Sequence, residues 1–182
     1  DRTHRCGGPH RDNGHPQGHQ SRRIVEQGFA FKDADQAAGE ADATLLAAAG
    51  LNRLGEHATG QALAADHWLP APGQGAILIE CRAGDARTRD ALAAINHVLS
   101  RAAVLAERAL LAALGGNCHS PIAALTSVDG SDLILRAALF SPDGSERVIG
   151  AARFRPGEHD GPARLAADLL ARAPLAVRAN FA

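Results

Sequence analysis

Hydrophobic and polar residues change their spacing along this 182-residue chain. Residues 1–29 contain no Ala and no Leu, whereas these two residues dominate the remainder. Over residues 86–114 the apolar positions recur at helical spacing, and over 122–154 they form short alternating runs. The pattern predicts a polar opening segment, followed by a helical part and then a β-rich part.

The β-rich part is expected to form an antiparallel sheet. Its apolar, branched runs are separated by the turn sequences DGS and SPDGS, which are typical of hairpins. The three predicted strands are Ile122–Val128, Asp132–Phe140 and Glu146–Phe154. Because a helical pattern returns over 161–173, we expect a compact α+β unit that begins at Asp85.

Two helices are expected before this sheet. The first, over 86–100, is predicted to be capped by Asp85, and the second, over 101–114, by Ser100. Gly115–Gly116 ends the second helix, and its spacing predicts one buried side. The apolar residues assigned to that side are Val104, Leu105, Ala109 and Leu111.

Shorter signals organise the part before residue 84. The apolar run Ala43–Ala48 predicts a buried strand, although Ala and Leu suit a helix equally well. A helical turn closed by Gly55 and a helix over 56–64 are expected next. Two prolines and two glycines within 67–75 indicate a defined linker, which leads into a predicted strand, Ala76–Arg82.

Composition and charge exclude several classes of function. A formal net charge of -1 argues against bulk electrostatic binding to nucleic acid or to an anionic membrane. No apolar run approaches the roughly 18–20 residues that a membrane span needs. The widely spaced Cys6, Cys81 and Cys118 do not suggest a disulfide framework. We therefore expect a cytoplasmic protein with neither a nucleic-acid nor a membrane partner.

The opening segment differs from the rest of the chain in amino-acid composition. The chain contains no methionine, and its first residues collect Gly, Arg, Pro and His. We therefore expect residues 1–38 to be a disordered or frameshifted segment of a truncated product. Cys6 with His4, His10, His15 and His19 resembles a metal cluster, but this spacing matches no structural zinc site, and no metal is expected.

Three residues are candidates for chemistry. Cys118 follows a Gly-Gly break between a predicted helix and strand, where it is either a small buried residue or a presented nucleophile. Arg53 is either a solvated surface residue or a clamp for an anion, together with backbone N–H groups that a turn at Gly50 directs at a carboxylate. Gln74 either belongs to a tight turn that leads into a strand or faces a cleft.

Three motifs carry a resemblance that covers about three-quarters of the chain. In order, they are "ADATLLAAAGLNRLG", "LPAPGQGAILIECR" and "AERALLAALGGNCHSPIAAL". In that order and spacing the chain resembles the porphobilinogen deaminases, also called hydroxymethylbilane synthases. The resemblance implies a fold of the α/β and α+β classes. Residues 39–84 would be the remnant of a periplasmic-binding-protein-like α/β domain with a hinge and a strand returning to the first domain. Residues 85–182 would form a small α+β domain with a three-stranded antiparallel sheet.

The resemblance also implies an activity and site residues. The family joins four porphobilinogen units head to tail with release of ammonia, on a dipyrromethane cofactor held by a cysteine thioether. Cys118 matches that cysteine, Arg53 matches an arginine of the "AGLxRLG" motif that would bind carboxylates, and Gln74 matches the "GQG" hinge. Partners would be porphobilinogen and the growing polypyrrole, bound by a monomer.

One departure from the family qualifies this interpretation. The family's catalytic aspartate and its other substrate arginines belong to motifs that residues 1–38 do not reproduce. We therefore expect the isolated chain to be inactive and assign no catalytic residue in it. The alternative is a non-catalytic α+β binding module that kept the fold and lost the chemistry.

Overall fold

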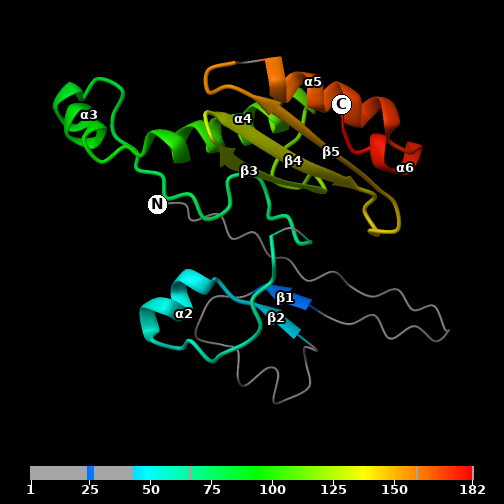
Figure 1. Ribbon diagram of the computed structural model, residues 1–182, viewed down its shortest axis with the longest axis horizontal. Helices are drawn as coiled ribbons and strands as arrows, with labels where there is room; N and C mark the ends of the chain where they lie inside the picture. The colour runs from blue at the N-terminus through cyan, green and yellow to red at the C-terminus, as the bar shows by residue number, and fades with distance from the viewer. Residues whose placement is uncertain (1–23, 27–42, 66, 159, 182) are drawn as a thin grey trace. The chain divides into compact units, whose positions relative to one another are not determined.

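The structure, a computed structural model, describes residues 24–26, 43–65, 67–158 and 160–181. They fall into two compact units, one within residues 1–62 and one within residues 63–182 (Figure 1). Each unit contains its own sheet, of two strands in the first and three in the second. Within the described ranges, every helix is too short or too polar to cross a lipid bilayer.

The first unit is a small parallel pair of strands followed by a helix. Strand β1 (Ile24–Glu26) pairs with β2 (Ala43–Leu45), and helix α2 (Ala48–Leu54) comes next. The predicted strand Ala43–Ala48 was therefore too long, because its last residue already starts the helix. Gly55 ends α2 with φ 76°, as predicted. Strand β1 lies within segment 1–38, whose other residues are outside the described ranges.

The sheet of the second unit confirms the predicted strands to within one residue. Its strands are β3 (Ile122–Asp129), β4 (Asp132–Phe140) and β5 (Arg147–Phe154). They form an antiparallel sheet in the order β3-β4-β5, joined by the two expected hairpin turns. The turns need Gly130 and Gly144, which have φ 62° and 72°, because such values are unfavourable for other residues.

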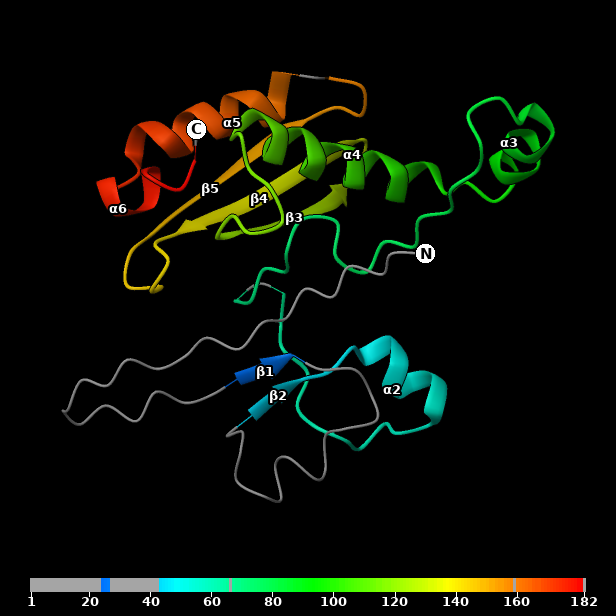
Figure 2. The same ribbon diagram turned by 180° about the vertical axis from the view of Figure 1, so that it is seen from behind.

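Helices cover one face of this sheet. Figures 1 and 2 show α4 (Val98–Ala113) and α5 (Asp160–Arg172) on the same side, with the short α6 (Leu175–Arg178) beyond. The predicted helix over 161–173 is thus confirmed. The core between the helices and the sheet contains Leu110, Leu114, Leu135, Leu139, Leu169 and Val177, all with no exposed surface.

The helical part before the sheet differs from the expectation. Helix α3 ends at Ala93 after starting at Ala86, so the predicted helix over 86–100 is wrong in its second half. Asp85 caps α3 as predicted, since its side chain accepts a hydrogen bond from the Thr88 N–H at 2.9 Å. The cap of α4 is His97 and not Ser100, because the imidazole accepts from the Ser100 N–H. Helix α3 itself buries no residue.

The buried side of α4 was also assigned wrongly. Leu105 and Ala109 are exposed, whereas Ala106, Glu107 and Leu110 are buried. The apolar residues of α4 occupy most of its circumference, so their spacing alone does not select the face that meets the sheet. Helix α4 does end before Gly115–Gly116, as expected.

Two predicted elements are absent from the described residues. Residues 56–64 form turns and irregular structure instead of a helix, and Gly60 within them has φ 76°, which an α-helix does not accommodate. The segment Ala76–Arg82 is irregular instead of a strand, and its Ile77 is 92% exposed. A strand requires a neighbouring strand to pair its backbone, and none of the described strands pairs with this segment.

Candidate functional site

The loop that carries Cys118 begins where α4 ends. Gly115 has φ 63°, and a Cβ atom at Gly116 would lie 2.6 Å from Cδ1 of Leu111 and 3.3 Å from its carbonyl oxygen. Both positions therefore require glycine, the first for its backbone conformation and the second for space. The Gly-Gly pair lets the chain turn away from the helix directly before the cysteine.

Hydrogen bonds within the loop hold its shape. The Asn117 N–H donates to Oγ of Ser120 at 2.9 Å, and the His119 N–H donates to Oδ1 of Asn117 at 2.8 Å. The Ser120 N–H closes the turn on the Asn117 carbonyl at 3.1 Å. Cys118 lies inside this turn and is an exposed, free thiol, so the interpretation as a buried small residue is wrong.

The thiol of Cys118 has no polar partner among the described residues. His119 follows it in the chain and is also exposed, but no hydrogen bond joins the two side chains. The loop therefore presents sulfur to solvent without a neighbouring base. Such a thiol can form a bond to a carbon electrophile that approaches from outside.

The linker that contains Gln74 is fixed to the same unit. The Ala124 N–H of β3 donates to the Pro70 carbonyl at 2.8 Å, and the Gly73 N–H donates to Oε2 of Glu107 at 2.6 Å. Gln74 itself is exposed. The other carboxylate oxygen of Glu107 accepts from the Thr126 N–H at 2.7 Å. Sequence reasoning missed this role of Glu107, whose only signal was an acidic residue within an apolar helix.

Arg53 lies in the first unit, in the last turn of α2, and is exposed. The backbone N–H groups of Gly50 and Leu51 both donate to the Ala47 carbonyl, at 2.9 and 3.2 Å. They are not available to an anion, so the expected clamp of N–H groups and guanidinium is wrong in its backbone half. The guanidinium alone can bind a carboxylate. Arg53 thus belongs to the first unit, and Cys118 belongs to the second.

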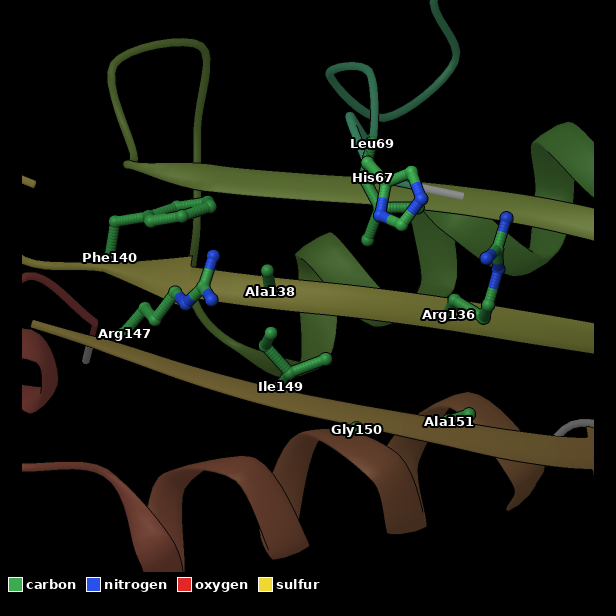
Figure 3. A pocket seen from close by; sticks show the side chains of 9 residues that line it. All are labelled: His67, Leu69, Arg136, Ala138, Phe140, Arg147, Ile149, Gly150 and Ala151. Carbon is green, nitrogen blue, oxygen red and sulfur yellow. The ribbon is translucent and has the colours of Figure 1, made fainter. Parts of the chain in front are cut away.

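A pocket that the sequence did not predict lies on the sheet face opposite the helices. It has a volume of about 360 Å³ and lies between the linker residues His67 and Leu69 and strands β4 and β5. Figure 3 shows Arg147 beside Phe140 at one end and Arg136 at the other. Arg136 also donates to the Ala65 carbonyl at 3.3 Å. The basic residues at the rim favour acidic ligands.

The described residues hold no group of three or more His, Cys, Asp or Glu side chains that is placed to bind a metal ion. The His-rich stretch with Cys6, named above as a possible cluster, lies outside the described residues.

Comparisons with known proteins place these residues in a family. Residues 31–90 match the model described as "Porphobilinogen deaminase, dipyromethane cofactor binding domain", and residues 101–172 match the "Porphobilinogen deaminase, C-terminal domain". Arg53 and Gln74 lie in the first match, and Cys118 lies in the second. The first match begins inside segment 1–38.

Curated relatives carry the same name. A porphobilinogen deaminase of Sphingopyxis alaskensis is 51% identical over 159 residues, which are 87% of this chain and 50% of the relative. Porphobilinogen deaminases of Xanthomonas campestris pv. campestris and Xanthomonas axonopodis pv. citri are 52% and 50% identical over 99 residues, or 54% of this chain and 33% of each relative.

This chain spans half the length of the first relative and a third of the others. The family models nevertheless match both the part that carries Arg53 and Gln74 and the part that carries Cys118. With relatives of the same name at about 50% identity, these matches show that the chain belongs to the porphobilinogen deaminase family.

Proposed function

We propose that this chain is a portion of a hydroxymethylbilane synthase, which condenses four porphobilinogen units head to tail and releases ammonia. The single observation that carries the proposal is the exposed thiol of Cys118 on a glycine-hinged loop, within the match to the family's C-terminal domain. In this proposal the protein is a cytoplasmic monomer that binds porphobilinogen and the growing polypyrrole.

Cys118 is the proposed attachment point of a dipyrromethane. The C–N bond of a porphobilinogen aminomethyl group would break, and its methylene carbon would form one C–S bond to the sulfur. The amine would leave as ammonia together with the thiol proton. A thioether has no readily displaced group, which suits a tether that is kept through every turnover. The bound group supplies the electron-rich pyrrole on which the chain grows. The protein's own part is to present the sulfur on an exposed loop.

Arg53 and Gln74 are the proposed binding residues for the acidic side chains. Each pyrrole of the substrate carries an acetate and a propionate, and a guanidinium binds a carboxylate through two parallel hydrogen bonds. Arg53 is exposed and free of any ion pair with a described residue, which leaves it available for such a partner. Gln74 is exposed and directly follows Gly73, whose backbone N–H is bound by Glu107.

The finer fold assignment is part of the same proposal. We infer that residues 39–84 belong to an α/β cleft domain, in which Ala76–Arg82 would pair as a strand with a sheet outside this chain. The strong exposure of Ile77, Leu78 and Ile79 supports this, since three consecutive apolar side chains are costly in water. Because the chain spans half of its first relative, we expect little or no turnover of porphobilinogen by this chain alone.

Mass spectrometry of the intact protein tests the proposal. We expect the purified protein to carry a mass increase equal to one dipyrromethane, and we expect Cys118→Ser to abolish it. Cys81→Ser is the matched control, since Cys81 is also an exposed free thiol and should not affect the adduct. An adduct that survives Cys118→Ser would overturn the assignment.

The alternative function, a non-catalytic α+β binding module, makes the opposite prediction. An unmodified Cys118 in protein that is otherwise folded would favour it. The exposed apolar segment Ile77–Ile79 is the observation that keeps this alternative open, because such a surface suits a macromolecular partner. Ammonia release from porphobilinogen is a second measurement. Robust turnover would contradict the binding module and also the expected inactivity of the isolated chain.

A further inference from the structure

The outer edge of β3 is covered by two different groups. An edge strand exposes backbone N–H groups that need partners. Along β3 the Ala124 N–H donates to the Pro70 carbonyl at 2.8 Å, and the Thr126 N–H donates to Oε1 of Glu107 at 2.7 Å. The backbone of the linker therefore accepts the hydrogen bond from Ala124, and the side chain of Glu107 in α4 accepts the one from Thr126.

Glu107 also holds the linker itself. Its second oxygen, Oε2, accepts from the Gly73 N–H at 2.6 Å. Gly73 adopts φ 74°, which only glycine adopts readily. Each carboxylate oxygen thus binds one backbone donor, one from β3 and one from the linker.

Burial makes these two contacts strong. Glu107 is only 6% exposed, and charge-assisted hydrogen bonds away from water are stronger than neutral ones. Removing the carboxylate would leave two N–H groups without an acceptor at a site that is part-buried. A surface glutamate would not have this effect, since water would take its place.

We propose that Glu107 is a positioning residue, which fixes the linker Leu69–Gly75, and with it Gln74, to the unit that carries the Cys118 loop. Helix α4 connects the two features, because Glu107 lies within it and Cys118 lies on the loop that follows its end. The linker therefore moves with the second unit and is not a flexible joint. The link to cofactor binding rests on the proposed function of Cys118 and Gln74, but the fixing of the linker does not.

Amide hydrogen exchange of the full chain tests this inference. In Glu107→Gln one oxygen of the pair becomes an NH2 group, which accepts no hydrogen bond, so one of the two N–H donors loses its partner. We expect exchange of the linker amides Gly73–Gly75 to accelerate by on the order of tenfold, with the amides of β4 changed less than twofold. Glu146→Gln, at an exposed glutamate, is the control and should alter neither set.

Two further variants keep the test decisive. Thr126→Val removes a hydroxyl but keeps the backbone N–H that Glu107 binds, so linker exchange should stay at the wild-type rate. Glu107→Asp keeps the charge, but its side chain is shorter by one methylene group and cannot reach both donors. Exchange of the same linker amides should therefore accelerate in this variant. It replaces the Gln variant in the test if that variant fails to fold.

Unchanged linker exchange in both Glu107 variants would overturn the proposal. Equal acceleration at the linker and in β4 would also overturn it, since that result describes a general loss of stability. The dipyrromethane mass on wild-type Cys118 is measured in parallel. Its absence would refute the proposed function and leave the exchange result to decide the role of Glu107.

Discussion

Thr126 has a hydrogen-bonded backbone N–H and an unpaired side-chain hydroxyl. Its N–H donates to Glu107 at 2.7 Å, but its buried hydroxyl oxygen has no hydrogen-bond partner among the described residues. A buried polar group without a partner loses its hydration and gains nothing in return. The position therefore uses the backbone of Thr126 and not its hydroxyl.

Replacing Thr126 by valine should not destabilise the protein. Thr126→Val removes the unpaired oxygen, keeps the branched shape that suits a strand, and should raise the free energy of unfolding by up to about 1 kcal/mol. Chemical denaturation measures this value. Thr126→Ser is the control, since it keeps the hydroxyl and loses the methyl group, and it should be less stable than wild type. A clear loss of stability in the valine variant would show that the hydroxyl has a partner in solution.

The β4–β5 hairpin is held by one exposed carboxylate. Oδ1 of Asp143 accepts from the Ser141 hydroxyl at 2.6 Å, the Ser145 hydroxyl at 2.8 Å and the Ser145 N–H at 3.1 Å. These bonds, the one from Ser141 above all, favour the charged form and lower the pKa of Asp143 to about 2. The turn is thus built around an ionised aspartate.

The hairpin should respond to acid in a defined window. Because the folded pKa of Asp143 is lowered from 3.8 to about 2, its contribution to stability is present above pH 3.8 and is lost as the pH falls toward 2. A carbon NMR titration of the Asp143 carboxyl should show a midpoint near 2. In a Ser141→Ala variant the midpoint should move up toward 3.8, and a wild-type midpoint already at that value would contradict the hydrogen-bonded turn.

The second unit contains the described hydrophobic core. Every member of that core lies between Ala102 and Phe181, in α4, α5, α6 and the three-stranded sheet or next to them. The unit also includes the linker, which Glu107 and Ala124 hold through hydrogen bonds. None of the described core residues lies within residues 1–62, so we expect the second unit to be stable without them.

A fragment of residues 63–182 should fold alone. We expect a single cooperative unfolding transition by circular dichroism, with a midpoint within a few degrees of that of the full chain, because every described core residue is retained. A fragment that starts at Asp85 is the control. It lacks Pro70 and Gly73, leaves the β3 edge and Glu107 without these partners, and should unfold at a lower temperature. Failure of the 63–182 fragment to fold would show that the first unit stabilises the second.

The parts of the fold that were predictable depend on local signals. The turns around Gly130 and Gly144 interrupt alternating apolar runs, so the strands on either side were predicted to within one residue. Asp85 and Gly55 were recognised because caps act on the nearest helical turn. The loop at Cys118 was predicted from Gly115–Gly116, its exposure was shown by the structure, and its proposed chemical role comes from the family resemblance.

By itself, the sequence determined the hairpin order, the cap of α3 at Asp85, the C-terminal ends of α2 and α4, and the identity of the family. These depend on neighbouring residues or on motifs that persist in the chain. Only the tertiary structure decided which side of α4 is buried, that Ala76–Arg82 is not a strand here, and that Glu107 binds Gly73 and Thr126. Each of these depends on a partner far away in the chain. A pattern of apolar residues shows that one face of a helix or strand must be buried, and tertiary packing determines which element covers that face.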